Sequence, residues 1–259
     1  MNAALVDVRG LEVFAGARLL AHVPELRVEA GQCSAIVGES GSGKTTTLMA
    51  ILGLHGVAGL TARGKIMLCG LDVLATSQRA LGAVRGRRAA LVMQSPQAAL
   101  NPTLRLGTLG RRALRRAGFS PEEADRRIAD ALHAVVLDQA LLRRYPHQVS
   151  GGQAQRFALA MAVALGAELI VADEPTSALD MTVQAEVMAL LRRLQRDRGL
   201  AVLLVSHDLA LVSGIARDVL VMRDGQVVET GPVSSVLLEP KEAYTRELLA
   251  ATPRLDGAA

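Results

Sequence analysis

The sequence predicts an α/β fold with a β-rich opening and an inserted helical segment. Two observations predict the sheet core: the apolar runs 35–37 and 169–172 each have the composition of a buried strand, one followed by glycines and the other by two acids. The third observation is that the stretch 103–164 contains no convincing strand. We therefore expect one domain over the whole chain, its core formed by 1–102 and 165–259.

The first part of the chain is expected to open on strands and then to form a helix. Strand-like runs alternate with turns over 5–37, and the first helix is expected over 44–52. A hairpin around 65–68 and a strand over 89–93 follow, before Asn101-Pro102 breaks the chain. The break marks the start of the helical segment.

One helix of the inserted segment has a clear start and a clear apolar face. The sequence Ser120-Pro121-Glu122-Glu123 is a typical helix N-terminus, with a capping residue, proline and acids in the first turn. Apolar side chains then recur at Ile128, Leu132, Val135 and Val136. These four positions mark one apolar face of the predicted helix.

Strands and helices alternate again in the last third of the chain. A helix is expected over 181–198 and a strand over 201–205. Two closing strands, 218–222 and 226–230, are expected around the turn Asp224-Gly225. Only the last five residues, beginning at Leu255, are expected to fray.

A glycine-rich loop follows the first buried strand. Residues 38–45, Gly-Glu-Ser-Gly-Ser-Gly-Lys-Thr, have the glycine, lysine and hydroxyl spacing of a phosphate-binding loop. The glycines let successive N–H groups point inward, and the positive end of the following helix favours an anion. Lys44 is then placed to reach the outer phosphates and the Thr45 hydroxyl to hold Mg²⁺.

Two acids end the second buried strand. Asp173 fits a magnesium shell, and Glu174, one residue on, is placed to polarise an attacking water. Ser150 to Gln153 form a capping-box pattern before a long helical run, 155–164. Glycines inside its first turn suggest that bare N–H groups approach an anion, and we expect this to be the nucleotide of a partner subunit.

These motifs, in this order and spacing, resemble the ATPase subunit of ATP-binding cassette (ABC) transporters over nearly the whole chain. The resemblance implies a P-loop NTPase cassette with a mixed sheet core, an N-terminal antiparallel β subdomain, and an inserted α-helical subdomain at 103–164. It implies an ATPase with ATP and Mg²⁺ as cofactors. It also implies that two cassettes close head to tail over the nucleotides.

The resemblance assigns further residues. Gln94 matches the glutamine loop, His207 the switch histidine, and Asp180 ends the dimer-contacting D-loop; Phe14 occupies the place of the aromatic side chain on adenine, although it also fits a core position. The catalytic candidates are Glu174, His207 and Gln94, and the metal candidates are Thr45, Gln94 and Asp173. The nucleotide-binding candidates are Phe14, Gly38, Glu39, Ser40, Gly41, Ser42, Gly43, Lys44, Thr45, Thr46, Gln94, Ser150, Gly151, Gly152, Gln153, Asp180 and His207.

Composition agrees with a folded domain. The chain has 259 residues, 50% of them apolar, and its longest apolar run, 157–167, is too short to span a bilayer. The start, Met1-Asn2-Ala3, lacks the pattern of a leader peptide. The chain is therefore expected to stay in the cytoplasm, and the resemblance implies a peripheral subunit at the cytoplasmic face of the inner membrane. Cys33 and Cys69 show no metal-ligand spacing and are expected to be buried free thiols.

The charge balance is only modestly basic. Twenty-nine lysines and arginines face 25 acids, for a net charge of +4, which does not require a nucleic-acid partner. Arginines cluster around 85–88, 111–116 and 143–144. These clusters suit solvent, anionic lipid or an acidic loop of a partner.

Several segments resemble the peptide and nickel importer branch of the family. They are Val37 to Thr45, Gln94-Ser95-Pro96 with Leu100 to Thr103, Tyr145-Pro146-His147, and Ser177 to Asp180 followed by Thr182-Val183-Gln184. Peptide members of that branch often carry a longer C-terminal extension, and this chain ends soon after Tyr244, which favours nickel or a metal chelate as cargo. Expected partners are transmembrane permease subunits docked near 95–109, a second and related ATPase subunit, and indirectly an extracytoplasmic substrate-binding protein.

Two other classes of protein stay open. One is a soluble cassette protein that acts as a clamp in DNA repair, chromosome structure or translation, and it would need a long coiled coil or two cassettes in one chain. The other is a scaffold subunit of a cytosolic enzyme complex. Co-purification with permeases or with soluble enzymes separates these possibilities.

Overall fold

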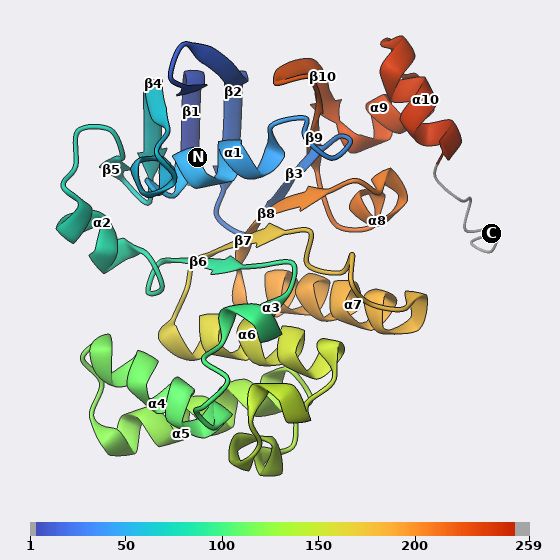
Figure 1. Cartoon of the computed structure of the whole chain (residues 1–259). Helices are drawn as coiled ribbons and strands as arrows, with labels where there is room; N and C mark the ends of the chain where they lie inside the picture. Colours follow the sequence, from blue (N-terminus) through green and yellow to red (C-terminus); the bar gives the residue numbers. More distant parts are fainter. Residues whose placement is uncertain (1–3, 252–259) are drawn as a thin grey trace.

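One sheet runs through the molecule (Figure 1). The computed structural model describes residues 4–251, so the expectations for Met1 to Ala3 and for 255–259 lie outside it. Within 4–251, ten strands join in the order β5-β4-β1-β2-β10-β9-β3-β8-β7-β6. The sheet is mixed, as predicted, because its two ends are built differently.

The strands are β1 (Ala4–Ala15), β2 (Arg18–Glu29), β3 (Cys33–Val37), β4 (Thr61–Leu68), β5 (Leu71–Asp72), β6 (Ala89–Val92), β7 (Leu169–Asp173), β8 (Ala201–Ser206), β9 (Asp218–Arg223) and β10 (Gln226–Pro232). The α-helices are α1 (Lys44–Ile51), α2 (Gln78–Val84), α3 (Pro96–Ala99), α4 (Leu106–Arg116), α5 (Pro121–Ala134), α6 (Gly151–Leu165), α7 (Met181–Arg198), α8 (Leu209–Ser213), α9 (Val233–Leu238) and α10 (Ala243–Ala251). Short 3₁₀ helices are η1 (His55–Ala58), η2 (Gln139–Arg143) and η3 (Pro146–Gln148).

Parallel strands form one end of the sheet, from β9 to the edge strand β6. β3 pairs with β8 and β9, β8 with β7, and β7 with β6, all in parallel. Every residue of β3 is buried, and its side chains alternate between two apolar clusters: Ala35 and Val37 lie in one and Ile36 in the other. Burial on both faces explains why these strands are continuous apolar runs.

Antiparallel pairs form the other end of the sheet. β1 pairs with β2 and β4, and β9 pairs with β10. The β9–β10 turn holds Asp224 at φ 49° and Gly225 at φ 79°, the positive pair that a two-residue hairpin turn requires. The amide of Gly225 donates to the carbonyl oxygen of Ser42 at 3.1 Å, so this turn also supports the loop after β3.

Helices α4, α5 and α6 lie together at the bottom of Figure 1, and α6 packs on both strand β6 and helix α7. The Ser120 hydroxyl accepts from the Glu123 amide at 3.2 Å, so α5 begins where its sequence predicts. Ile128, Leu132 and Val135 are buried as expected. The expectation for Val136 is wrong: it follows the end of α5, takes φ 55°, and is 65% exposed, because the left-handed turn directs it away from the core.

Most predicted elements are confirmed within a few residues. β1 and β2 are 12 residues each, longer than the short runs expected, and β4 begins at Thr61, earlier than the predicted hairpin. Between residues 4 and 251, no helix is long and apolar enough to cross a membrane. Cys33 and Cys69 are free and buried, as predicted, and burial raises the pKa of both thiols, that of Cys69 to about 11.

We predict that Gly225→Ala lowers the free energy of unfolding by about 1–3 kcal/mol, because alanine is strained at positive φ. Its Cβ would also lie 2.7 Å from the carbonyl oxygen of Leu20. Gly82→Ala is the matched control, since Gly82 lies in α2 with nothing within 4 Å of the added methyl. Urea denaturation should show Gly82→Ala unchanged or stabilised by about 0.5–1 kcal/mol. Equal midpoints for the two variants would contradict the argument.

Candidate functional site

A cavity of about 330 Å³ opens at the carboxyl ends of β3, β7 and β8. In a parallel sheet this edge is where ligands bind, because loops and helix starts converge there. The cavity is lined by Ser40, Gly41, Gly43, Lys44, Thr45, Thr46, Gln94, Asp173, Glu174 and His207. The structure therefore brings together residues that the sequence scatters over more than 160 positions.

The loop 38–45 joins β3 to α1 and lies tightly against the sheet. A Cβ at Gly38 would collide with the carbonyl of Met222, and one at Gly43 would lie 2.8 Å from the carbonyl oxygen of Leu20. Gly43 also takes φ 98° as the residue before α1. No side chain caps α1, so its first N–H groups are left for an anionic ligand.

Lys44 is the buried cation of the site. Only 5% of the residue is exposed, and its Nζ donates to the carbonyl oxygens of Gly38 and Glu39, both at 2.7 Å. Glu174 Oε1 lies 3.8 Å away. Burial lowers the pKa of Lys44, and the neighbouring carboxylates of Glu174, Asp173 and Glu39 act in the opposite direction.

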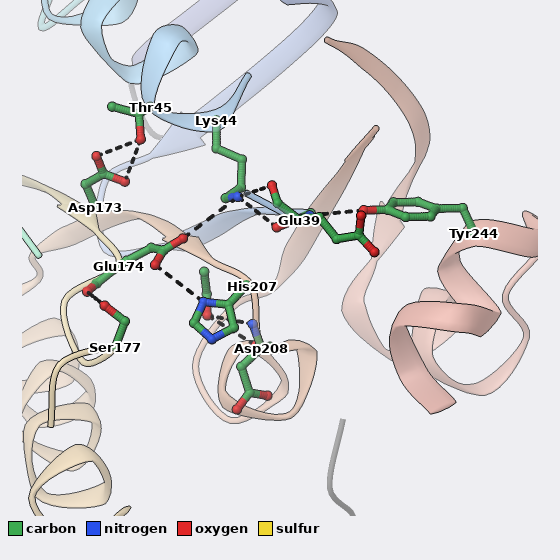
Figure 2. Close-up of polar contacts among 11 residues, drawn as sticks. Glu39, Lys44, Thr45, Asp173, Glu174, Ser177, His207, Asp208 and Tyr244 are labelled. Carbon is green, nitrogen blue, oxygen red and sulfur yellow. Dashed lines mark hydrogen bonds and ion pairs between the residues drawn. The ribbon is translucent and has the colours of Figure 1, made fainter. Parts of the chain in front are cut away.

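Thr45 and Asp173 meet across the cavity, as Figure 2 shows. The Thr45 hydroxyl lies 3.2 Å and 3.0 Å from the two carboxylate oxygens of Asp173. Burial raises the pKa of Asp173, the bond from Thr45 lowers it, and the charge of Glu174 raises it again. Two hard oxygen ligands side by side are what Mg²⁺ prefers in a site shared with phosphates.

Glu174 lies between two basic side chains (Figure 2). Its Oε1 faces Lys44, and its Oε2 lies 3.4 Å from Nδ1 of His207. Glu174 takes φ 46°, a left-handed conformation that is uncommon for a residue other than glycine, and its amide donates to Val205 at 3.0 Å. Sequence reasoning chose this residue but gave no sign of its backbone conformation.

Phe14, Ser150 to Gln153, and Asp180 do not line the cavity. Phe14 lies on β1, half-buried, with the guanidinium of Arg63 5.2 Å from its ring centroid. Asp180 caps α7 by accepting from the Val183 amide at 3.0 Å. In the described part of this chain, these predicted residues therefore lie outside the cavity at the loop after β3.

The predicted capping box at the start of α6 is present. The Ser150 hydroxyl accepts from the Gln153 amide at 3.2 Å, and Gln153 Oε1 accepts from the Ser150 amide at 3.1 Å. The structure also shows a packing reason for Gly152 that sequence reasoning missed, since a Cβ there would collide with the Val183 side chain of α7. Ser150 itself is exposed.

Sequence reasoning also missed Tyr244, which reaches the loop after β3 from α10. The Glu39 amide donates to its hydroxyl at 3.0 Å. The two residues are 205 positions apart, so no local motif reveals the contact.

Fold and site together define an ATP-binding cassette of the P-loop type. Residues 22–177 match the family model described as ABC transporter. The chain therefore belongs to the ABC transporter family and is one of its ATPase domains.

The relatives cover most of this chain. The chain is 42% identical over 229 residues to the peptidoglycan transport ATP-binding protein YejF of Agrobacterium fabrum, a match covering 88% of this chain and 41% of YejF. It is 38% identical to the oligopeptide transport ATP-binding protein OppD of Bacillus subtilis, covering 88% of this chain and 65% of OppD. This chain thus spans less than half of one relative and under two thirds of the other.

A solved structure confirms the fold. The ATP-binding cassette MJ0796, in a dimeric post-hydrolysis state bound to ADP and Pi, superposes with a TM-score of 0.76 at 26% identity. The superposition covers 88% of this chain and 98% of that one.

We predict that Lys44→Ala weakens ATP binding about 10- to 100-fold, because a charge-assisted bond to phosphate is lost. Lys65→Ala, at an exposed position of β4, is the matched control and should bind ATP like the wild type. Isothermal titration of the purified chain measures both affinities. An unchanged affinity in Lys44→Ala would show that phosphate binds elsewhere.

Proposed function

We propose that this chain is the ATP-hydrolysing subunit of an ABC importer that takes up peptides through permease partners at the cytoplasmic face of the membrane. One observation carries the proposal: Lys44, the Thr45–Asp173 pair and the Glu174–His207 pair converge in one cavity. The relatives' names support a peptide cargo. They give no support to the preference for nickel or a metal chelate drawn from the sequence.

The triphosphate is bound by the loop after β3 and the start of α1. The N–H groups of residues 40–46 surround the β-phosphate, and Lys44 leaves the carbonyl oxygens of Gly38 and Glu39 to reach the outer phosphates. This exchange adds little desolvation free energy, because Lys44 is already removed from water. Phe14 stacks on adenine with the ring face that Arg63 leaves open.

Residues at the end of β7 and the start of α1 fit Mg²⁺. The hydroxyl of Thr45 and the carboxylate of Asp173 already lie within hydrogen-bond distance, and Gln94 lines the same cavity. A bound Mg²⁺ would neutralise charge on the phosphates. The Thr45 hydroxyl donates to the carboxylate of Asp173, which holds the two side chains together.

Glu174 and His207 carry the hydrolytic step. Glu174 is held by its backbone turn and by Ser177, whose hydroxyl donates to its carbonyl oxygen at 3.2 Å, so its carboxylate is positioned to orient the attacking water. His207 follows β8 and lies 3.4 Å from the Glu174 carboxylate, a position from which it would contact the γ-phosphate. Lys44 offsets the charge that develops on the phosphate oxygens.

Two cassettes complete each site. Ser150 to Gln153 lie outside the cavity of their own chain, so we propose that they bind the nucleotide of the partner, with Asp180 at the contact. The dimeric structure of MJ0796 supports this arrangement. The partner is a second copy or a related ATPase subunit, and closure of the pair precedes hydrolysis.

The inserted segment 103–164 forms a helical subdomain in this proposal, and residues 95–109 form the docking site for the permease. A substrate-binding protein outside the membrane delivers the peptide and does not touch this chain. The transport names of the relatives favour this reading over a soluble clamp or scaffold protein, and no nucleic-acid partner is required.

We predict that Glu174→Gln keeps ATP affinity within about threefold and lowers kcat at least 100-fold, because loss of a general base removes about 10²–10⁴ in rate. Phosphate release and nucleotide titration measure the two effects separately. Glu25→Gln, at an exposed position of β2, should hydrolyse ATP at the wild-type rate. Turnover near the wild-type rate in Glu174→Gln would remove Glu174 from the mechanism.

A second prediction concerns the shared site. In a Glu174→Gln background, ATP should cause association of the chain with itself or with its co-expressed partner ATPase, measured by light scattering, and Ser150→Arg should abolish it. Ser120→Arg is the matched control, because both serines cap a helix at 3.2 Å and each replacement costs about 1 kcal/mol of stability. Equal loss of association in both variants would point to a folding defect and contradict the interface.

A further inference from the structure

Tyr244 connects the C-terminal helix to the phosphate-binding loop. Its hydroxyl accepts from the Glu39 amide at 3.0 Å, a contact drawn in Figure 2. The residue is only 5% exposed, and the guanidinium of Arg223 lies 4.8 Å from its ring centroid. None of the steps assigned above to nucleotide binding or hydrolysis uses this tyrosine.

The contact fixes one peptide unit of the loop from both sides. The peptide between Gly38 and Glu39 offers its carbonyl oxygen to Lys44 Nζ at 2.7 Å and its N–H to Tyr244. In a trans peptide these two groups point in opposite directions, so the unit bridges the lysine and the tyrosine. The orientation of this peptide therefore decides where one of the two carbonyl acceptors of Lys44 lies.

The helix that carries Tyr244 is itself tied to the sheet. The carboxylate of Glu229, on β10, accepts from the amides of Lys241 at 2.9 Å and Glu242 at 3.2 Å, just before α10 begins. Burial alone would raise the pKa of Glu229, but its pKa is lowered by the neighbouring Thr245 hydroxyl, the amides of Lys241 and Glu242, and the charge of Lys241. A charge-assisted pair of bonds thus holds the start of α10 in place.

We propose that Tyr244 is a positioning residue for nucleotide binding: it holds the Gly38–Glu39 peptide, and with it the loop from which Lys44 reaches the triphosphate, in place. The C-terminal helix then regulates the site, because any contact that displaces α10 releases the loop. This inference rests on the proposed nucleotide site and adds to it a control element outside the cavity.

The test is Tyr244→Phe in the full chain, which removes one hydroxyl and keeps the ring. The Kd and KM for MgATP should rise about 3- to 10-fold, the effect of one hydrogen bond, with kcat at saturating ATP within about twofold of the wild type. If Tyr244 only stabilises the fold, Tyr244→Phe lowers the unfolding midpoint and leaves the Kd and KM for MgATP unchanged. That second outcome would overturn the proposal.

Tyr145→Phe is the matched control, since the chain has two tyrosines and no tryptophan. It should bind MgATP like the wild type, and it leaves Tyr244 as the single tyrosine, so that emission excited at the tyrosine band reports on this residue. Nucleotide binding should change the tyrosine emission of this variant. Coupling is reciprocal, so a loop whose conformation depends on Tyr244 must change the surroundings of Tyr244 when it binds nucleotide. Emission that stays constant at saturating nucleotide would contradict the coupling.

Glu229→Gln tests the same connection without touching the loop. It loosens the start of α10, so the Kd should rise in the same direction, and the double variant with Tyr244→Phe should bind no more weakly than Tyr244→Phe alone. Additive losses of ATP affinity in the double variant would show that Glu229 and Tyr244 act independently, and would overturn the proposal. Failure of the wild-type chain to bind ATP would instead overturn the proposed function, so the two failures are distinguishable.

Discussion

The buried charge of Lys44 is the constraint around which the site is built. A lysine that is 95% removed from solvent needs partners, and the loop supplies two carbonyl oxygens while Glu174 supplies a nearby carboxylate. The loop can supply these carbonyls only because it lies so close to β9 that Gly38 has no room for a side chain. Sheet packing and site electrostatics therefore depend on the same few residues.

The order of the strands explains why the remaining groups are near this lysine. β3 pairs with β8, and β8 with β7, so the residues that follow each strand emerge at one edge. Asp173, Glu174 and His207 come from two of these ends. Parallel pairing thus places acids and a histidine opposite a helix start without any of them being close in sequence.

Much of this arrangement was predictable from sequence, because local patterns carried it. Buried strands, the loop after β3, and the caps at Ser120 and Ser150 each follow from a few neighbouring residues. Long-range contacts were not predictable. The collision that keeps Gly152 a glycine involves Val183, and the partner of the Glu39 amide is Tyr244; neither pair shares a local pattern.

The packing of Gly152 against Val183 has a mechanical consequence. The segment from Glu174 to Asp180 is stiffened by bonds from Ser177 to Glu174 and from Leu179 to Thr176, and it leads directly into α7. Glu174 in the cavity and the Ser150 cap of α6 are therefore connected through this segment and the first turn of α7. In the proposed pair of cassettes, this connection joins the residues proposed to bind the partner's nucleotide to the glutamate of the chain's own cavity.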